Sequence, residues 1–239
     1  MIVLRKKRLV FVLVAILVSV SVFTIANKTK YTQGTVQVAS LPVSGKVIVL
    51  DAGHGTPDEG AKSSNGTTEA QTNLAITLKV QTLLEQSGAT VILTRSDDNA
   101  IYDLDSKTLK EKKVSDIHNR VKIGNESQAD IFVSIHLNKI PEQQYYGWQC
   151  FYKKGSEGGE SLAKSLQSNL NEAIQRENKR EAKTIEDIYI VKHVEIPLAI
   201  VECGFLSNPE EEKLLLTDDY QDKLAWGIYN GIMDYFYER

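Results

Sequence analysis

Short apolar runs rich in β-branched residues alternate with longer segments of helical periodicity from residue 46 onward. The runs, each short enough for a strand, lie at 47–50, 90–94, 131–136, 148–152 and 198–202. The segments with helical spacing lie at 68–87, 107–127, 159–177 and 219–237. Strands that alternate with helices form a sheet covered on both faces. The pattern therefore predicts an α/β fold, a three-layer sandwich with a mainly parallel central sheet.

An uncharged apolar run precedes this domain. The basic cluster Arg5 to Arg8 is followed by eighteen uncharged residues, Leu9 to Ala26, which as a helix would span about 27 Å, close to the hydrocarbon thickness of a bilayer. Basic residues on this flank hold the N-terminus in the cytoplasm. We therefore expect residues 1–27 to be a signal anchor or signal peptide, 28–45 a polar linker, and 46–239 a folded domain exported to the outer side of the cytoplasmic membrane. The run is longer than the usual signal-peptide core and lacks an A-x-A site, which favours a membrane anchor over secretion.

The net charge and the cysteines of the predicted exported domain limit what it can bind. Beyond residue 30 the chain has 22 basic and 31 acidic residues, a net charge of −9, which argues against nucleic-acid binding. The two cysteines, Cys150 and Cys203, lack zinc-ribbon spacing and permit one disulfide or none.

Three ionisable residues, His54, His136 and Glu202, fall at or just after the C-terminal ends of predicted strands. In open α/β sheets ligands bind at that edge. Glu69 begins the helix that follows His54, so its carboxylate can return to the same edge. Two imidazoles and one carboxylate form a His₂Glu set, which is typical of catalytic zinc and leaves a position for water. By spacing alone a histidine at a strand end is more often structural than a metal ligand, and no H-E-x-x-H signature is present here.

Glu202 would then be a second carboxylate beside the metal. Its apolar neighbours, Ile200, Val201 and Phe205, would raise its pKa into the range useful for proton transfer. Strand alternation directs the next residue, Cys203, to the opposite face of the sheet.

Four motifs in order, Asp51-Ala-Gly-His-Gly55, Glu69, Ser134-Ile-His-Leu-Asn138 and Glu202-Cys-Gly-Phe-Leu-Ser-Asn208, resemble those of the zinc-dependent N-acetylmuramoyl-L-alanine amidases (the Amidase_3 family). The resemblance covers residues 46–239. It implies that His54, Glu69 and His136 bind Zn²⁺ and that Glu202 is catalytic. The implied reaction is hydrolysis of the amide between N-acetylmuramic acid and L-alanine in peptidoglycan. One domain behind a membrane-targeting segment looks most like the spore-cortex and germination (CwlD-type) amidases, which implies a role in cortex maturation.

Departures from the family pattern at Ala52, Thr56 and Leu137 remove no ligand, and those at Thr56 and Leu137 would alter the wall of the groove. Two other functions stay open: a zinc peptidase that cuts within the stem peptide, and a non-catalytic wall-binding scaffold. The presence of both candidate catalytic carboxylates argues against the scaffold. A regulatory protein partner also stays open.

Several further residues are weaker candidates. Asn73, Asn138 and Arg95 are candidate substrate-binding residues, although a structural ion pair is an alternative for Arg95. The aromatic residues Tyr145, Tyr146 and Trp148 either stack on sugar faces or form the fringe of an edge strand. Structural roles are expected for Arg120, His118 and His193.

Overall fold

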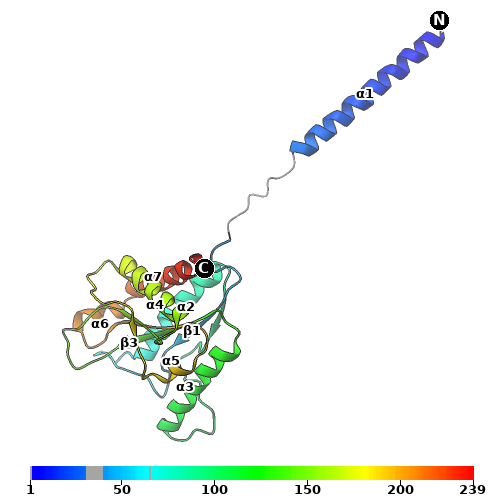
Figure 1. Ribbon diagram of the computed structural model, residues 1–239. Coiled ribbons are helices and arrows are strands. Elements are labelled where there is room, and N and C mark those ends of the chain that lie inside the picture. Colours follow the sequence, from blue (N-terminus) through cyan, green and yellow to red (C-terminus); the bar gives the residue numbers. More distant parts are fainter. Residues whose placement is uncertain (1, 31–39, 65) are drawn as a thin grey trace. The chain divides into compact units, whose positions relative to one another are not determined.

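The computed structural model describes the backbone of residues 2–30, 40–64 and 66–239, and the side chains of this set apart from 2–7 and 23–30 (Figure 1). The chain divides into two compact units, Met1–Ser40 and Leu41–Arg239. The first contains helix α1 (Ile2–Lys30). The predicted membrane-targeting segment, 1–27, includes residues whose side chains lie outside the described set, and the predicted linker, 28–45, includes the undescribed residues 31–39. Within the described residues, no helix combines the length and the apolarity that a membrane crossing requires.

The second unit is built on a six-stranded sheet with the order β2-β1-β3-β6-β4-β5. The strands are β1 (Val47–Ala52), β2 (Thr90–Leu93), β3 (Ile131–Asn138), β4 (Gln149–Tyr152), β5 (Lys183–Thr184) and β6 (Leu198–Phe205). Strands β2, β1, β3 and β6 run parallel, whereas β4 runs antiparallel to β6, with β5 parallel to β4. The prediction of a mainly parallel sheet is confirmed.

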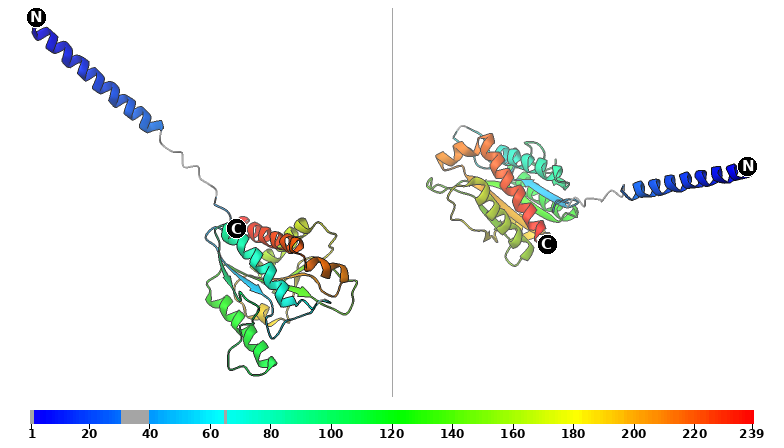
Figure 2. Two further views of the ribbon diagram at one scale, coloured as in Figure 1. Left: turned by 180° about the vertical axis from the view of Figure 1, so that it is seen from behind. Right: turned by 90° about the horizontal axis from the view of Figure 1, so that it is seen from above.

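Helices cover both faces of this sheet, which confirms the three layers. Helices α2 (Glu69–Gln86), α4 (Glu157–Ile174) and α7 (Asp218–Tyr237) lie side by side on one face and contribute to the larger hydrophobic core (Figure 2). On the other face, α3 (Leu109–Glu126) and α5 (Tyr189–His193) contribute to the smaller core. Helix α6 (Pro209–Leu215) follows β6.

Local sequence signals explain where these helices begin. Helix α2 starts at a capping box, in which the Thr68 hydroxyl accepts from the backbone N–H of Gln71 and the Gln71 side chain accepts from that of Thr68. Helix α6 starts with Asn208 as its N-cap and Pro209 in its first turn. Strand β5 and helix α5 were not predicted, because elements of two and five residues are too short to show a periodicity.

The folded unit begins earlier than the predicted boundary at residue 46. Val43 is fully buried in the core, and the N–H of Gly45 donates to the carbonyl of Gly88 at 2.9 Å. Residues 41–45 therefore belong to the folded unit rather than to a linker, because a buried side chain and a long-range hydrogen bond hold them there.

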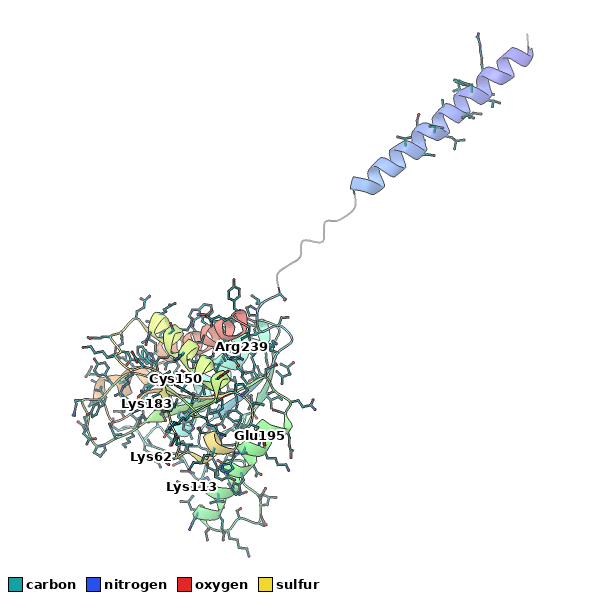
Figure 3. All side chains as sticks on the ribbon, viewed as in Figure 1. Lys62, Lys113, Cys150, Lys183, Glu195 and Arg239 are labelled. Carbon is teal, nitrogen blue, oxygen red and sulfur yellow. The ribbon has the colours of Figure 1, made fainter. Side chains whose placement is uncertain are left out.

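Both cysteines are free and buried. Cys150 lies in the interior of the domain (Figure 3), and Cys203 belongs to the same hydrophobic core. The choice left open by the sequence is thereby resolved in favour of no disulfide, and burial raises the pKa of both thiols.

Candidate active site

His54, Glu69 and His136 converge at the carboxyl edge of the sheet. One ligand atom from each lies within 4.8 Å of the others. Glu69 Oε1 is 3.2 Å from His54 Nε2 and 3.2 Å from His136 Nδ1. The three residues come from the loop after β1, the first turn of α2 and the end of β3. This arrangement gives one carboxylate and two imidazole nitrogens the spacing to hold a metal ion.

The backbone at residues 53 and 54 is tightly constrained by its surroundings. His54 has a φ of 63°, a left-handed conformation that costs a non-glycine residue about 1–3 kcal/mol and persists only where the surroundings hold it. Arg120 Nη2 donates to the carbonyl of His54 at 2.5 Å and so helps to hold it. A Cβ atom on Gly53 would lie 2.2 Å from His136 Cε1. Glycine at position 53 therefore lets the imidazole of His136 lie directly against the backbone.

Glu69 is held from several sides as an ionised acceptor. Its Oε2 accepts from the N–H of Ala61 at 3.0 Å, and its Oε1 accepts from the N–H of Leu137 at 3.2 Å. Burial would raise the pKa of Glu69, but hydrogen bonds from His136 and His54 outweigh it and hold the pKa well below the usual range. The carboxylate is therefore charged at neutral pH, as a metal ligand must be.

The carboxylate of Asp58 lies next to the imidazole of His54. Its Oδ2 lies 3.4 Å from His54 Nδ1, the ring nitrogen directed away from Glu69, and its Oδ1 lies 2.8 Å from Lys113 Nζ. Lys113 is on α3, as Figure 3 shows. Burial lowers the pKa of His54, but Asp58 and Glu69 raise it more, to about 9, so binding of a cation there would displace a proton.

A carboxylate on the outer nitrogen of a ligating histidine is usual in zinc sites, where it sets the tautomer and orientation of the ring. Asp58 was not among the site residues predicted from the sequence. Its position in a loop, four residues after His54, was the available signal.

A buried ionic network lies beneath the site. Arg120 Nη1 pairs with Asp51 Oδ1 at 2.5 Å, and Arg120 Nε pairs with Asp116 Oδ2 at 2.8 Å. The hydroxyls of Ser134 and Thr94 donate to the same Asp51 carboxylate. Burial would raise the pKa of Asp51, but Arg120 holds it below the usual value. The network joins β1, β3, α3 and the end of β2, and it gives Arg120 the structural role that the sequence predicts.

Glu202 lies beside the three candidate ligands. It pairs with His136 in the parallel register of β3 and β6, so the two side chains project from the same face of the sheet. Both line a cavity of about 150 Å³. Its other lining residues are isoleucines and charged side chains, which include Ile117, Ile188, Ile190, Ile200, Asp58, Lys113, Asp116 and Arg120. Burial raises the pKa of Glu202, against an opposing effect of His136. Its Oε2 is buried and has no hydrogen-bond partner among the described residues.

The three candidate substrate-binding residues are placed differently. Asn73 is fully buried, and its Nδ2 donates to the carbonyl of Gly53 at 3.2 Å and to Glu69 Oε1 at 3.4 Å. Arg95 is also buried and donates to four backbone carbonyls, those of Ala52, Gly53, Ala70 and Asp97. This geometry makes both residues supports of the loop after β1 rather than contacts of a substrate. Among the described residues, no carboxylate forms an ion pair with Arg95.

Asn138 is half-buried at the end of β3, where the register with β6 shifts. Of the three aromatic candidates, Trp148 is only 1% exposed and its Nε1 donates to Asn171 Oδ1 at 2.8 Å. Its interpretation as a sugar-stacking residue is therefore wrong, because the indole is part of the core. His193 stacks on Tyr189, and His118 packs against the same ring.

Comparison with known proteins agrees with this geometry. Residues 48–234 match the family described as N-acetylmuramoyl-L-alanine amidase. The chain is 42% identical over 200 residues to the germination-specific N-acetylmuramoyl-L-alanine amidase of Bacillus subtilis, which covers 84% of each chain. Among solved structures, it is similar to the CwlD amidase from Clostridioides difficile in complex with the GerS lipoprotein, with a TM-score of 0.79 and 45% identity over 82% of this chain and 100% of that one.

A second solved structure, an N-acetylmuramoyl-L-alanine amidase from Clostridium difficile 630, has a TM-score of 0.72 and 28% identity over 82% of this chain and 99% of that one. The fold and the edge-of-sheet site thus define a hydrolase of the bacterial cell wall. The chain belongs to the N-acetylmuramoyl-L-alanine amidase family and is an enzyme of that activity.

Proposed function

We propose that this amidase is zinc-dependent, that His54, Glu69 and His136 hold the metal, that Glu202 is catalytic, and that it acts on spore-cortex peptidoglycan. The observation that carries the proposal is the approach of three ligand atoms within 4.8 Å of one another, next to Glu202, whose Oε2 is buried. The cortex substrate is supported by the 42% identity to a relative named as germination-specific.

The residues fit a zinc ion on two counts. The set of two imidazoles and one carboxylate is a usual zinc donor set that leaves a coordination position free. Glu202 Oε2 is a buried acceptor with no partner in the described part of the chain, and such atoms normally have one. A water molecule or a substrate amide at the metal would donate the missing hydrogen bond to Glu202 Oε2.

Glu202 has the position and the environment of a general base and acid. A bound zinc ion would polarise the amide carbonyl and lower the pKa of its water to about 7. Glu202 takes the proton of the attacking water and returns it to the departing amine of L-alanine. Its raised pKa favours both transfers, because a carboxyl group that titrates nearer neutrality accepts and releases a proton readily.

Mass spectrometry of digested peptidoglycan tests the reaction. Residues 31–239, loaded with zinc, are incubated with purified cortex-type and vegetative peptidoglycan. We expect intact stem peptides with a free L-alanine amino terminus, together with glycan that has lost its peptide, and more product from the cortex type. Shortened peptides still attached to glycan would instead identify a stem-peptide peptidase and overturn the proposal.

The metal assignment gives a direct prediction. His54→Ala and His136→Ala should each lose zinc and activity together, since two remaining protein ligands hold a catalytic zinc poorly. Elemental analysis and turnover are measured on the same preparations. Trp226→Ala, an exposed position on α7, is the control and should retain both. Full zinc occupancy in either histidine variant would contradict the assignment.

We also propose that the N-terminal segment anchors the enzyme on the outer side of the cytoplasmic membrane. The support is the basic cluster Arg5 to Arg8 followed by eighteen uncharged residues. In intact protoplasts, added protease should cleave residues 41–239 from the full chain. Protection of that unit from protease would contradict export.

A regulatory protein partner is the last part of the proposal. It is supported by the similar CwlD amidase, whose structure is a complex with a lipoprotein. Turnover of the purified chain on peptidoglycan should change when a lipoprotein partner that binds it is added. Unchanged turnover with the partner bound would count against a regulatory role.

A further inference from the structure

Two exposed tyrosines and two arginines form a surface beyond the candidate active site. Tyr145 and Tyr146 are 44% and 43% exposed. The guanidinium of Arg180 lies 5.9 Å from the ring centroid of Tyr145, and that of Arg176 lies 6.0 Å from the ring centroid of Tyr146. We call these four residues the tyrosine–arginine surface. A cavity of about 290 Å³ is lined by Tyr145, Tyr146 and Arg180 of this surface, together with Gln144, Glu177, Asn178 and Lys179.

Hydrogen bonds hold this surface in place. Arg180 Nε donates to the carbonyl of Tyr146 at 3.1 Å, and Asn178 Nδ2 donates to the carbonyl of Trp148 at 2.8 Å. The N–H of Gly147 donates to the buried carboxylate of Glu211 at 2.8 Å. These bonds fix the backbone at residues 146–148 and the guanidinium of Arg180, so less conformational entropy is lost when a ligand binds there.

The tyrosine–arginine surface is continuous with the catalytic carboxylate. Arg180 Nη1 donates to Gln149 Oε1 at 3.3 Å. Gln149 is the direct partner of Glu202 in the antiparallel register of β4 and β6, and opposed residues in such a pair share a face of the sheet. Arg180 also stacks 4.7 Å from the ring centroid of Phe205. A polymer seated at Glu202 therefore meets Gln149, Arg180 and the two tyrosines in turn.

The chemistry of this surface suits a nearly neutral, hydroxylated ligand. Its positive charges, Arg176, Lys179 and Arg180, are largely balanced by Glu177 and Glu181, and Lys179 pairs with Glu177 at 3.1 Å. A strongly anionic peptide would find little net attraction there. Flat aromatic rings rimmed by amide and guanidinium donors instead match a pyranose ring, which has apolar C–H faces and a rim of hydroxyl and acetamido groups.

We propose that the tyrosine–arginine surface binds the N-acetylated glycan strand next to the muramic acid residue whose amide is cut. The inference rests on the proposed function, because it takes the strand attached to that amide as the ligand. It makes Tyr145 and Tyr146 specificity-determining residues that favour polymeric substrate over short fragments.

The test uses peptide-free N-acetylglucosamine oligomers as the probe, titrated into the zinc-loaded full chain in detergent and followed by calorimetry. The double variant Tyr145→Ala/Tyr146→Ala should bind the oligomers at least about tenfold more weakly than the wild type. Tyr237→Ala, a tyrosine 78% exposed at the end of α7, is the matched control and should bind as the wild type does. Circular dichroism verifies that each variant is folded.

Kinetics supply a second readout. The double variant should raise KM for polymeric peptidoglycan and leave kcat unchanged, and both constants should be unchanged for a muropeptide with a single muramic acid. Oligomers that fail to bind the wild type, or that bind the double variant equally well, would overturn the proposal. The proposal would also fail if the double variant bound the oligomers normally but lost binding to free stem peptide or to a protein partner. If the wild type bound the oligomers but did not hydrolyse the amide, the proposed function would be refuted and the glycan-binding site would stand.

Discussion

Replacing Glu202 with glutamine is expected to lower turnover by about 10²-fold or more while the zinc content and the fold are retained. The substitution is nearly isosteric, and in the proposed mechanism Glu202 acts through its proton rather than through the metal. The amide of glutamine cannot accept the proton of water or return it to the leaving amine. The measurements are turnover on one defined muropeptide, zinc stoichiometry and circular dichroism.

Glu69→Gln is the matched comparison, since it makes the same chemical change in the candidate metal ligand. A neutral amide binds zinc more weakly than a carboxylate, so this variant should lose metal first and regain part of its activity in excess zinc. Wild-type turnover in Glu202→Gln would refute the mechanism even if the metal assignment holds. Equal loss of zinc in both variants would make Glu202 a ligand instead of a base.

Replacing Arg120 with methionine is expected to reduce the free energy of unfolding by about 3–5 kcal/mol, because it leaves the Asp51 carboxylate buried without its charge partner. Both side chains are at most 2% exposed. The midpoint of thermal unfolding should fall by on the order of 10 °C for a domain of this size. Lys79→Met is the control. Its ion pairs with Asp218 and Asp222 are largely solvent-exposed on the aspartate side, so it should cost less than about 1 kcal/mol.

The pH dependence of the Arg120 variant follows from the same pair. Arg120 holds the pKa of folded Asp51 below the value of an unfolded aspartate. The stability from this pair is therefore present above the unfolded pKa and is lost as the pH falls through the folded pKa. Denaturant unfolding of wild type and variant should give curves that differ most near neutral pH and approach each other in acid. A difference that grows in acid would contradict this account.

The main strands and helices, and the meeting of the four candidate site residues at one sheet edge, could be predicted from the sequence. Both depend on patterns of neighbouring residues. Alternating apolar runs indicated parallel strands, and the carboxyl ends of parallel strands share one edge. His54, His136 and Glu202 were therefore expected close together, as the structure has them. The cap of α6 at Asn208 was also visible locally, because an N-cap residue and a proline in the first turn are signals of a few residues.

The sequence by itself determined which side chains meet at the edge of the sheet, and only the tertiary structure decided which of the remaining candidates are accessible. Asn73, Arg95 and Trp148 have polar or aromatic groups suited to binding, yet all three are buried, with partners in the protein interior. Asp58 reaches His54 through a loop that no periodicity describes. The physical reason is that burial and long-range hydrogen bonds depend on how helices pack on both faces of the sheet, whereas strand direction and helix caps are set by neighbouring residues.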